Sequence, residues 1–290
     1  MSKIIIMKGL PASGKSTKAE ELMRAYGNTV RVNKDLLRTM LHFDKFNGPN
    51  ESITKAMARM IAKECLRDGI NVIIDDTNLN SGVMQGWKDL GKEMNAKIEH
   101  VDMTDVPIEE CLKRDKIRSK KVGKSVIVNM ALQNGLYPKP EKGYVICDID
   151  GTLADIRHRL HFVKVPEGEK KDWKGFFEAM THDTVRMDVL GMLAGYIGNG
   201  YDIVFMSGRP DNYRKFTEQF VEDVIPGYVT LMMRNSNDKR PDTEVKKELL
   251  DRYFKDKSLI HAVIDDRPSV IRMWKEEGLN VVDVGNGEEF

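Results

Sequence analysis

Two short apolar runs, each leading directly into a glycine-containing turn, constrain the fold of this 290-residue sequence more than any other feature. They cover residues 3–8 and 144–147. Continuous apolar runs of this length are typical of strands buried on both faces, as in the parallel sheets of α/β proteins. We therefore predict two parallel sheets, each beginning with one of these runs.

A linker separates the two predicted sheets. Residues 137–143 contain two prolines, a glycine and charged side chains, without an apolar period. We place the boundary there, with one domain at 1–140 and a second at 141–290. At roughly 150 residues per domain, a chain of this length has room for two.

Alternating strand-like and helix-like segments fill both domains. In the first, we expect strands at 3–8, 29–32, 70–74 and 97–102, and helices at 15–26, 52–68, 83–94 and 107–118. In the second, we expect strands at 144–147, 202–206, 228–232, 260–264 and 280–284, and helices at 186–198, 212–223, 243–253 and 268–277. This alternation predicts parallel α/β units in both domains.

Composition and charge narrow the class of protein. No apolar run approaches the ~20 residues of a membrane-spanning helix, and the three cysteines include no C-x-x-C pair. We therefore expect a cytoplasmic protein without a membrane partner. Residues 1–140 carry 24 basic against 17 acidic side chains, whereas residues 141–290 carry 22 against 28. The basic first domain favours an anionic substrate there over idle surface charge.

Residues 9–17 fit the pattern G-x-x-x-x-G-K-[ST] without departure. Its glycines let backbone N–H groups surround a phosphate, and the following helix adds its positive N-terminal dipole. Lys15 would reach the β- and γ-phosphates, and the Ser16 hydroxyl would bind Mg²⁺. This motif predicts ATP as cofactor with Mg²⁺, and the expected binding residues are Gly9, Ser13, Gly14, Lys15, Ser16 and Thr17.

Polar residues after the second and third strands could form the acceptor side. Asp35 could accept a proton from an attacking hydroxyl, or it could simply cap a helix. Arg38, three residues later, could hold an anionic group beside that hydroxyl. Asp75 and Asp76 follow the strand residues 72–74. An acid at this place could organise Mg²⁺ or orient the nucleophile, or it could simply cap the strand end.

A basic run lies between residues 113 and 124. Asp115 is its only acid, and its bases are Lys113, Arg114, Lys116, Arg118, Lys120, Lys121 and Lys124. We predict that this basic run is a lid that closes over phosphates. The alternative is that it forms a solvated helix face without such a role. Arg114 and Arg118 are four residues apart, so we expect them on one helix face, where arginine can stabilise a transferring phosphoryl group.

A second set of polar residues follows successive strands of the second domain. Asp148 and Asp150 stand two apart after the strand 144–147, so that one could attack phosphorus and the other protonate the leaving oxygen. A calcium-binding or purely structural turn is the alternative. Further polar side chains argue against this alternative, and they are Ser207, Arg209, Lys246, Asp265 and Asp266. The aspartates among them offer carboxylate oxygens, which Mg²⁺ prefers as ligands. Residues 155–185 could form a small cap.

These ordered motifs resemble the phage-type bifunctional polynucleotide 5′-kinase/3′-phosphatase family over essentially the whole chain. The resemblance rests on residues 9–17, 33–38, 75–80, 148–153, 207–209 and 264–267, with Arg114, Arg118 and Lys246. The second half alone resembles the haloacid-dehalogenase phosphatase superfamily. The implied fold is α/β, with a P-loop NTPase-like parallel sheet followed by a haloacid-dehalogenase-like Rossmannoid domain with a small cap.

The resemblance also implies roles for single residues. In the first domain, Asp35 would be the general base on a 5′-hydroxyl, Arg38 would bind the terminal nucleotide's phosphate, and Arg118 with Arg114 would hold the ATP phosphates. Asp76 is our match for the family's acid, because Asp75 stands where a small residue is usual.

In the second domain, Asp148 would be the nucleophile and Asp150 the general acid. Ser207, Arg209 and Lys246 would bind phosphate, and the metal set would be Ser16 in the first domain with Asp148, Asp150, Asp265 and Asp266. Either Arg157 or Arg159 could match the family's cap arginine.

The implied function is the healing of RNA or DNA ends, by phosphorylation of 5′-hydroxyls and removal of 3′-phosphates or 2′,3′-cyclic phosphates. The resemblance implies a nucleic-acid ligase as functional partner, homo-oligomer formation, and a host-cytoplasm location if the protein is phage-encoded. One alternative is a small-metabolite kinase fused to a metabolite phosphatase. Another is a nucleotide-dependent binding module with an inactive phosphatase, which intact Asp148 and Asp150 oppose.

Overall fold

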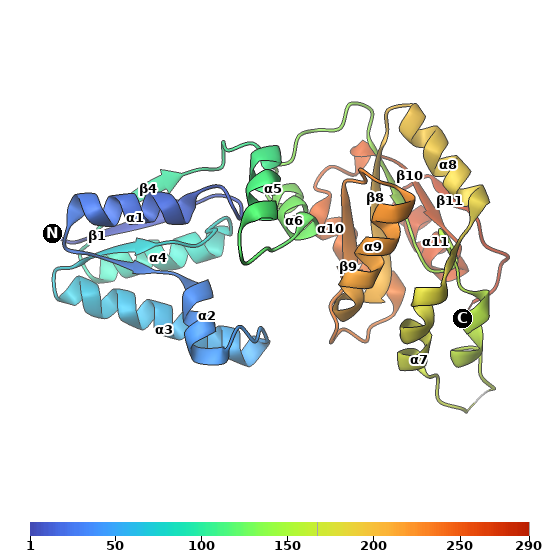
Figure 1. Ribbon diagram of the computed structural model, residues 1–290, viewed down its shortest axis with the longest axis horizontal. Helices are drawn as coiled ribbons and strands as arrows, with labels where there is room; N and C mark the ends of the chain where they lie inside the picture. Colours follow the sequence, from blue (N-terminus) through green and yellow to red (C-terminus); the bar gives the residue numbers. More distant parts are fainter. Residues whose placement is uncertain (167, 290) are drawn as a thin grey trace. The chain divides into compact units, whose positions relative to one another are not determined.

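The computed structural model describes residues 1–166 and 168–289, and the chain forms two compact units, Met1–Leu136 and Tyr137–Phe290 (Figure 1). Within the described residues, no helix combines the length and the apolar character that a membrane span requires.

The first unit is a parallel sheet covered by helices. Its strands lie in the order β2-β3-β1-β4, and their bounds are β1 Lys3–Lys8, β2 Thr29–Val32, β3 Asn71–Ile74 and β4 Lys97–Asp102. The helices are α1 Lys15–Tyr26, α2 Lys34–His42, α3 Gly48–Arg67, α4 Ser81–Glu93, α5 Ile108–Ile117 and α6 Lys124–Gln133.

Strand β1 explains why helices cover both faces of this sheet. Its side chains alternate between the two faces, as the strand geometry requires. Ile4 and Ile6 pack against α3 and α4, whereas Ile5 and Met7 pack against Ala19 of α1. A strand that is apolar on both faces is therefore buried in the middle of the unit, and its carboxyl end presents the loop that follows.

The second unit is also built on a parallel sheet, with the strand order β11-β10-β5-β8-β9. Its strands are β5 Tyr144–Cys147, β8 Asp202–Pro210, β9 Thr230–Arg234, β10 Ile260–Asp265 and β11 Val281–Asp283. Its long helices are α8 Met187–Gly198, α9 Arg214–Val224, α10 Asp242–Tyr253 and α11 Pro268–Glu276. Helices α8 and α9 cover one face, and α10 and α11 contact strands β8, β9 and β10.

A small substructure sits beside this second sheet. It contains the antiparallel pair β6 Ala154–Asp155 and β7 Thr184–Val185, a 3-10 helix at Arg157–Phe162 and the short helix α7 Trp173–Glu178. It lies where the sequence predicted a cap.

The predicted α/β class with two parallel sheets is confirmed. Two helices, α2 and α6, were not among the predicted elements, because their short apolar patterns follow charged or glycine-containing turns. The predicted helix 107–118 ends at Ile117, and Arg118 has extended backbone angles. Arg114 and Arg118 therefore do not share a helix face, which corrects that expectation.

Candidate active sites

The loop between β1 and α1 is held closely by a neighbouring segment. The Gly9 N–H donates to the Thr77 carbonyl at 3.0 Å, and Asn78 Nδ2 donates to the Met7 carbonyl at 2.7 Å. A Cβ on Gly9 would lie 2.8 Å from Ser13 Oγ and 2.9 Å from the Met103 carbonyl oxygen, at a φ of 153°. Only glycine fits this tight turn, as the phosphate-binding motif requires.

Lys15 lies inside this loop. Its Nζ donates to the Leu10 carbonyl at 2.6 Å and lies 3.4 Å from Ser13 Oγ. Burial lowers the pKa of Lys15, although Asp75 and Cys111 act in the opposite direction. Ser16 and Thr17 are exposed in the first turn of α1, which contains no acidic residue. The helix N-terminus is thus free of competing negative charge, as an anion site requires.

Arg114 of α5 reaches the phosphate-binding loop directly. Its Nη1 donates to the Ser13 carbonyl at 3.0 Å, and its Nε donates to Glu110 at 2.7 Å. Arg118 lies near enough to Lys15 for its charge to lower the pKa of that lysine. Arg114 therefore contacts the loop directly, whereas Arg118 lies near it and pairs with Asp115.

The single acid of the basic run organises the segment that follows α5. Asp115 is buried and accepts hydrogen bonds from the N–H groups of Val122 and Gly123, at 3.1 and 2.9 Å. It also pairs with Arg118 Nε at 2.6 Å. Three of the segment's groups are thereby fixed by one carboxylate, a role that sequence reasoning missed.

The same segment reaches the helix that carries the predicted acceptor residues. Lys120 Nζ donates to Thr39 Oγ1 and to Asp44 Oδ2, each at 2.9 Å. The basic run therefore connects the nucleotide loop with α2, and this geometry supports its interpretation as a lid.

Asp35 does not cap helix α2. Asn33 is the N-cap, because its Oδ1 accepts the Leu36 N–H at 2.9 Å. The alternative that Asp35 caps the helix is wrong. The Asp35 side chain is 81% exposed and pairs with Arg38 Nη1 at 2.6 Å. Arg38 also donates to Glu51 at 2.5 Å, and this bond contributes most to the raised pKa of Arg38.

Asp75 and Asp76 differ in their partners. Asp75 is buried and pairs with Arg31 at 2.7 Å, so it is fixed by a charge that the sequence pattern did not indicate. Asp76 accepts the Lys34 N–H at 3.1 Å, which joins the end of β3 to the start of α2. Burial raises the pKa of Asp76. The charges of both carboxylates act to raise the pKa of Lys15.

In the second unit, Lys246 of α10 joins two predicted carboxylates. Its Nζ lies 2.7 Å from Asp148 Oδ1 and 2.8 Å from Asp265 Oδ2. Asp265 also accepts the indole N–H of Trp274 at 3.1 Å and the backbone N–H groups of the two residues that follow it. The carboxyl ends of the parallel strands β5 and β10 bring these groups together.

Three carboxylates form a group that fits a divalent cation. Asp148, Asp265 and Asp266 each offer an oxygen within 4.8 Å of the others, and hard divalent cations prefer such ligands. Burial raises the pKa of Asp148, and burial together with Asp265 raises the pKa of Asp266 to about 6. A bound cation would relieve this repulsion. Asp150, which the sequence placed in the same metal set, lies outside this group.

The side chain of Asp150 is instead held by two arginines. Arg159 Nη2 and Arg209 Nη2 both lie 2.5 Å from its Oδ1. Burial opposes ionisation, but the charges of Arg209 and Arg159 hold the pKa of Asp150 below its usual range. In this conformation Asp150 is a carboxylate, so a proton-donor role requires one arginine to exchange partners first. Arg209, predicted to bind phosphate, is the one that a phosphate would draw away.

The structure also separates the two candidate cap arginines. Arg159 is fully buried and donates to Asp150, Asp183 and the Phe176 carbonyl. Arg157 is 86% exposed and pairs only with Asp155 among the contacts described. Asp183 bridges Arg159 and Arg209 at 2.7 Å each. Sequence reasoning missed Asp183, because a lone aspartate before a two-residue strand carries no signal.

A cavity of about 710 Å³ opens onto Asp148 and Asp150. Trp173, Phe176 and Phe177 form an aromatic wall, with Trp173 and Phe177 stacked at a centroid distance of 6.0 Å. Arg234 and Arg267 also line the cavity, and both pair with Asp242.

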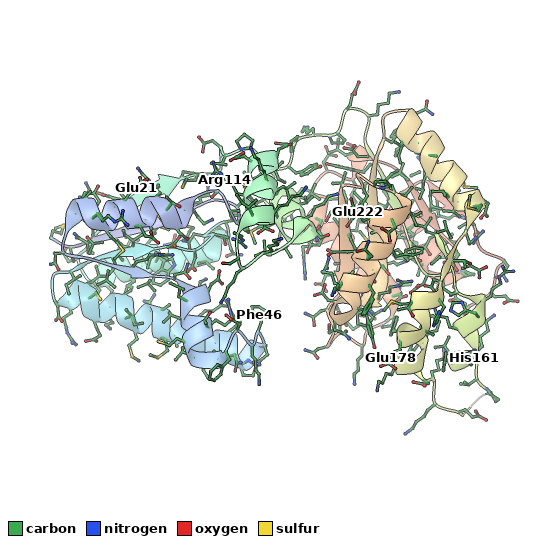
Figure 2. The ribbon with its side chains drawn as sticks, in the orientation of Figure 1. Glu21, Phe46, Arg114, His161, Glu178 and Glu222 are labelled. Atoms are coloured by element: carbon green, nitrogen blue, oxygen red, sulfur yellow. The ribbon has the colours of Figure 1, made fainter. Side chains whose placement is uncertain are left out.

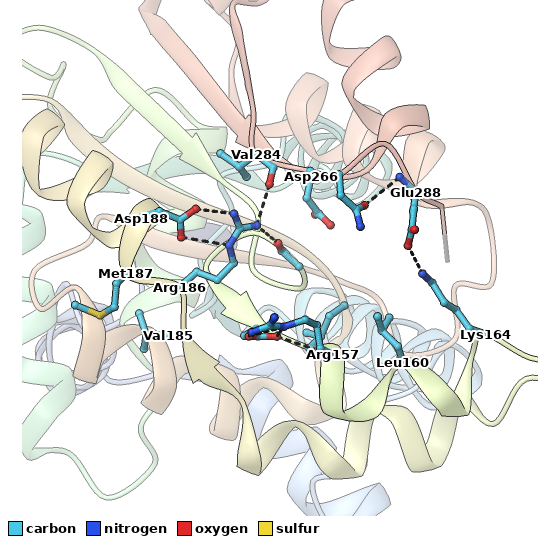
Figure 3. Close-up of a pocket in the computed structure, with 15 residues that line it drawn as sticks. Arg157, Leu160, Lys164, Val185, Arg186, Met187, Asp188, Asp266, Val284 and Glu288 are labelled. Atoms are coloured by element: carbon cyan, nitrogen blue, oxygen red, sulfur yellow. Dashed lines mark hydrogen bonds and ion pairs between the residues drawn. The ribbon is translucent and has the colours of Figure 1, made fainter.

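A second cavity of about 580 Å³ reaches Asp266 and Gly151 (Figure 3). Its cationic side chains are engaged: Arg186 donates to the Gly151 and Val284 carbonyls, and Lys164 pairs with Glu288. The lining carries three basic and four acidic side chains, an excess of acids that does not suit a phosphate site.

Comparison with known families matches both units. Residues 142–289 match a family described as the phosphatase domain of the polynucleotide kinase PNKP. Residues 4–134 match a family described as an AAA domain.

Individual relatives cover almost the whole chain. A protein of Autographa californica nuclear polyhedrosis virus, described as a bifunctional polynucleotide kinase/RNA ligase, is 28% identical over 303 residues, which span 94% of this chain and 41% of that protein. The chain thus spans less than half the length of this relative. Chains from two structures of a Pnkp1/Rnl/Hen1 complex, one described as an RNA repair complex, are 29% and 30% identical. These matches cover 99% of this chain and 97% and 98% of those chains, with a TM-score of 0.43 in both cases.

Proposed function

The chain belongs, through residues 142–289, to the family of PNKP-type polynucleotide kinase phosphatase domains, and from this premise we propose that it is a bifunctional enzyme that heals nucleic-acid ends. The first unit would transfer the γ-phosphate of ATP to a 5′-hydroxyl of RNA or DNA. The second would remove a 3′-phosphate. The resulting 5′-phosphate and 3′-hydroxyl are the ends that a nucleic-acid ligase joins, so we propose a ligase as its functional partner.

In the kinase reaction, the described side chains would bind and position the reactants. Lys15 lies within the loop that would surround the phosphates, and Arg114 and Arg118 lie beside it. Asp35, exposed at the start of α2, would accept the proton of the attacking 5′-hydroxyl. Arg38 would hold the phosphate of that nucleotide. Mg²⁺, bound at Ser16, would offset the negative charge of the ATP phosphates.

In the phosphatase reaction, Asp148 would attack the phosphorus and form an aspartyl phosphate as the bond to the 3′-oxygen breaks. Asp150, protonated from solvent once Arg209 has moved to the phosphate, would give its proton to the leaving 3′-oxygen. Water would then hydrolyse the acyl phosphate and regenerate Asp148. Lys246, 2.7 Å from Asp148, would hold the charge of the phosphoryl oxygens with Ser207. Mg²⁺ at Asp148, Asp265 and Asp266 would supply further charge compensation.

One observation carries this proposal for the second unit: Asp148, Lys246, Asp265 and Asp266 converge at one sheet edge, within the residues that match the family. Two buried carboxylates share one buried lysine here, with a third carboxylate beside them, and such a concentration of buried charge is costly and weak evidence for a role in stability alone. The phosphate-binding loop, with Arg114 against it, supports the kinase half in the same way.

The test is a pair of assays on two variants. ATP labelled at the γ-phosphate is incubated with a 5′-hydroxyl oligonucleotide, and release of phosphate is measured from a 3′-phosphate oligonucleotide. Lys15→Ala should abolish the first activity and spare the second, and Asp148→Asn should do the reverse. Transfer to a nucleoside or sugar but not to the oligonucleotide would contradict the proposal, as would loss of both activities from either change.

A further inference from the structure

The turn after α2 contains two consecutive residues in a left-handed backbone conformation. Phe43 has a φ of 50° and Asp44 a φ of 62°. The Phe43 N–H donates to the Thr39 carbonyl at 3.1 Å, so Phe43 occupies the position after a helix where glycine is usual. A bulky residue at positive φ is a genuine outlier, and such strain concentrates at functional sites.

Other contacts hold this turn in place. The Asp44 carboxylate accepts Thr39 Oγ1 at 2.5 Å and Lys120 Nζ at 2.9 Å. The hydrogen bond from Thr39 and that from Lys120 lower the pKa of Asp44, so its charge supports the turn. The surroundings therefore fix a conformation that Phe43 itself disfavours.

The consequence of this turn is an exposed apolar strip. Phe43 is 87% exposed and Phe46, three residues later, is 74% exposed. Figure 2 labels the side chain of Phe46 in the segment between α2 and α3. Met40 and Leu36, about one and two helical turns before Phe43 on α2, are also exposed. The strip thus consists of Leu36, Met40, Phe43 and Phe46, and neither aromatic ring belongs to a core cluster of this unit.

The strip begins beside the acceptor residues of the proposed kinase. Asp35 precedes Leu36, and the Arg38 guanidinium lies 5.3 Å from the centre of the Phe46 ring. Phe43 follows Asp35 by eight residues, a distance of about 12 Å along a helix. A strand whose 5′-hydroxyl lies at Asp35 would therefore reach Phe46 first and Phe43 beyond its terminal nucleotide.

The basic residues beside the strip favour a ligand that is a polyanion with flat bases. Lys120 and Lys121 lie on the segment that contacts this turn, and residues 1–140 carry an excess of basic side chains. Exposed aromatic rings interleaved with cations are how proteins bind single-stranded nucleic acid without reading its sequence. A contact between two copies of the chain would not require the basic flank or the position beside Asp35.

We propose that Phe43 and Phe46 form a stacking platform for the bases next to the 5′ end of a single-stranded acceptor. This inference rests on the proposed polynucleotide kinase activity. The platform would give the kinase a preference for polynucleotides over mononucleotides, because a mononucleotide does not extend to Phe43.

The decisive variant is Phe43→Gly, because glycine suits the left-handed conformation. This change should raise the thermal unfolding temperature of the kinase unit while it weakens binding of long acceptors. The KM for an oligonucleotide, divided by the KM for a nucleoside 3′-phosphate, should rise at least about 5-fold, the lower end of what loss of one stacked base implies. Phe43→Trp should restore the ratio. Phe216, 55% exposed on α9 of the other unit, provides the control Phe216→Ala, which should leave the ratio unchanged.

Three results would overturn the inference. An unchanged KM ratio in Phe43→Gly, with phosphate transfer by the wild type intact, would refute the platform alone. The same rise in Phe216→Ala would show that the effect is not specific. A lower mass in light scattering for Phe43→Gly, with an unchanged ratio, would identify the strip as a contact between copies. Wild-type protein that phosphorylates no polynucleotide would refute the proposed function together with the platform.

Discussion

Lys246 Nζ lies 2.7 Å from Asp148 Oδ1, and it lies almost as close to Asp265. All three side chains are buried. Burial opposes the charge of the lysine, yet the two carboxylates hold the pKa of Lys246 above its usual range. This cation therefore allows several negative charges to coexist at the end of β5.

Replacing Lys246 by alanine should abolish the phosphatase activity and destabilise the second unit by about 3–5 kcal/mol, the usual effect of removing one partner from a buried ion pair. Thermal unfolding and phosphate release measure the two effects. Lys247→Ala is the matched control, because the neighbouring lysine is half exposed and pairs only at the surface with Glu277. Equal effects in both variants would contradict the role of Lys246.

Arg159 and Arg157 offer a second matched pair. Arg159→Ala removes a buried cation from Asp150 and Asp183, so we expect a large loss of phosphatase activity and a destabilisation of about 3–5 kcal/mol. Arg157→Ala, at an exposed site, should leave both stability and activity nearly unchanged. Phosphate release and urea unfolding provide the measurements. Comparable losses in the two variants would refute the assignment of Arg159 to the site.

The motif residues could be predicted because their chemistry depends on local spacing. Gly9 must turn tightly and Lys15 must follow it at a fixed distance, and both requirements are written in a few consecutive positions. Asp148 and Asp265 are likewise placed by strand ends that a run of apolar residues predicts.

The supporting residues could not be predicted, because their partners are distant in sequence and their types are common. Glu51 meets Arg38 only because α3 packs beside α2. Asp183 meets Arg209 across 26 positions of the chain. The conflict between Asn33 and Asp35 for the cap of α2 depends on where the helix begins, to within two residues, which a sequence pattern does not resolve.

Asp115 should act as a positioning residue for the kinase. Asp115→Ala removes the carboxylate that holds Arg118 and the N–H groups of Val122 and Gly123. We expect kcat/KM for ATP to fall by about 10- to 100-fold, because Arg118 would no longer be held in position. The freed segment should also be cleaved faster by trypsin at its basic residues.

The control is Glu109→Ala, which removes an exposed acid on the same helix. A fall in kcat/KM without faster cleavage would argue against loosening of the segment.

Asp266 predicts how pH and a divalent cation act together on the second unit. Burial and Asp265 raise its pKa to about 6. Without metal, folding therefore favours the protonated carboxyl, and this contribution, about 3 kcal/mol at most, is lost as pH rises from about 4 through 6. Mg²⁺ favours the ionised form instead. The rise in unfolding temperature on adding Mg²⁺, relative to chelator, should thus be larger above pH 6 than below it.

Asp266→Asn should remove most of this pH dependence, whereas Asp223→Asn, at an exposed site on α9, should preserve it. A shift of equal size on both sides of pH 6 in the wild type would show that Asp266 does not help to bind the cation.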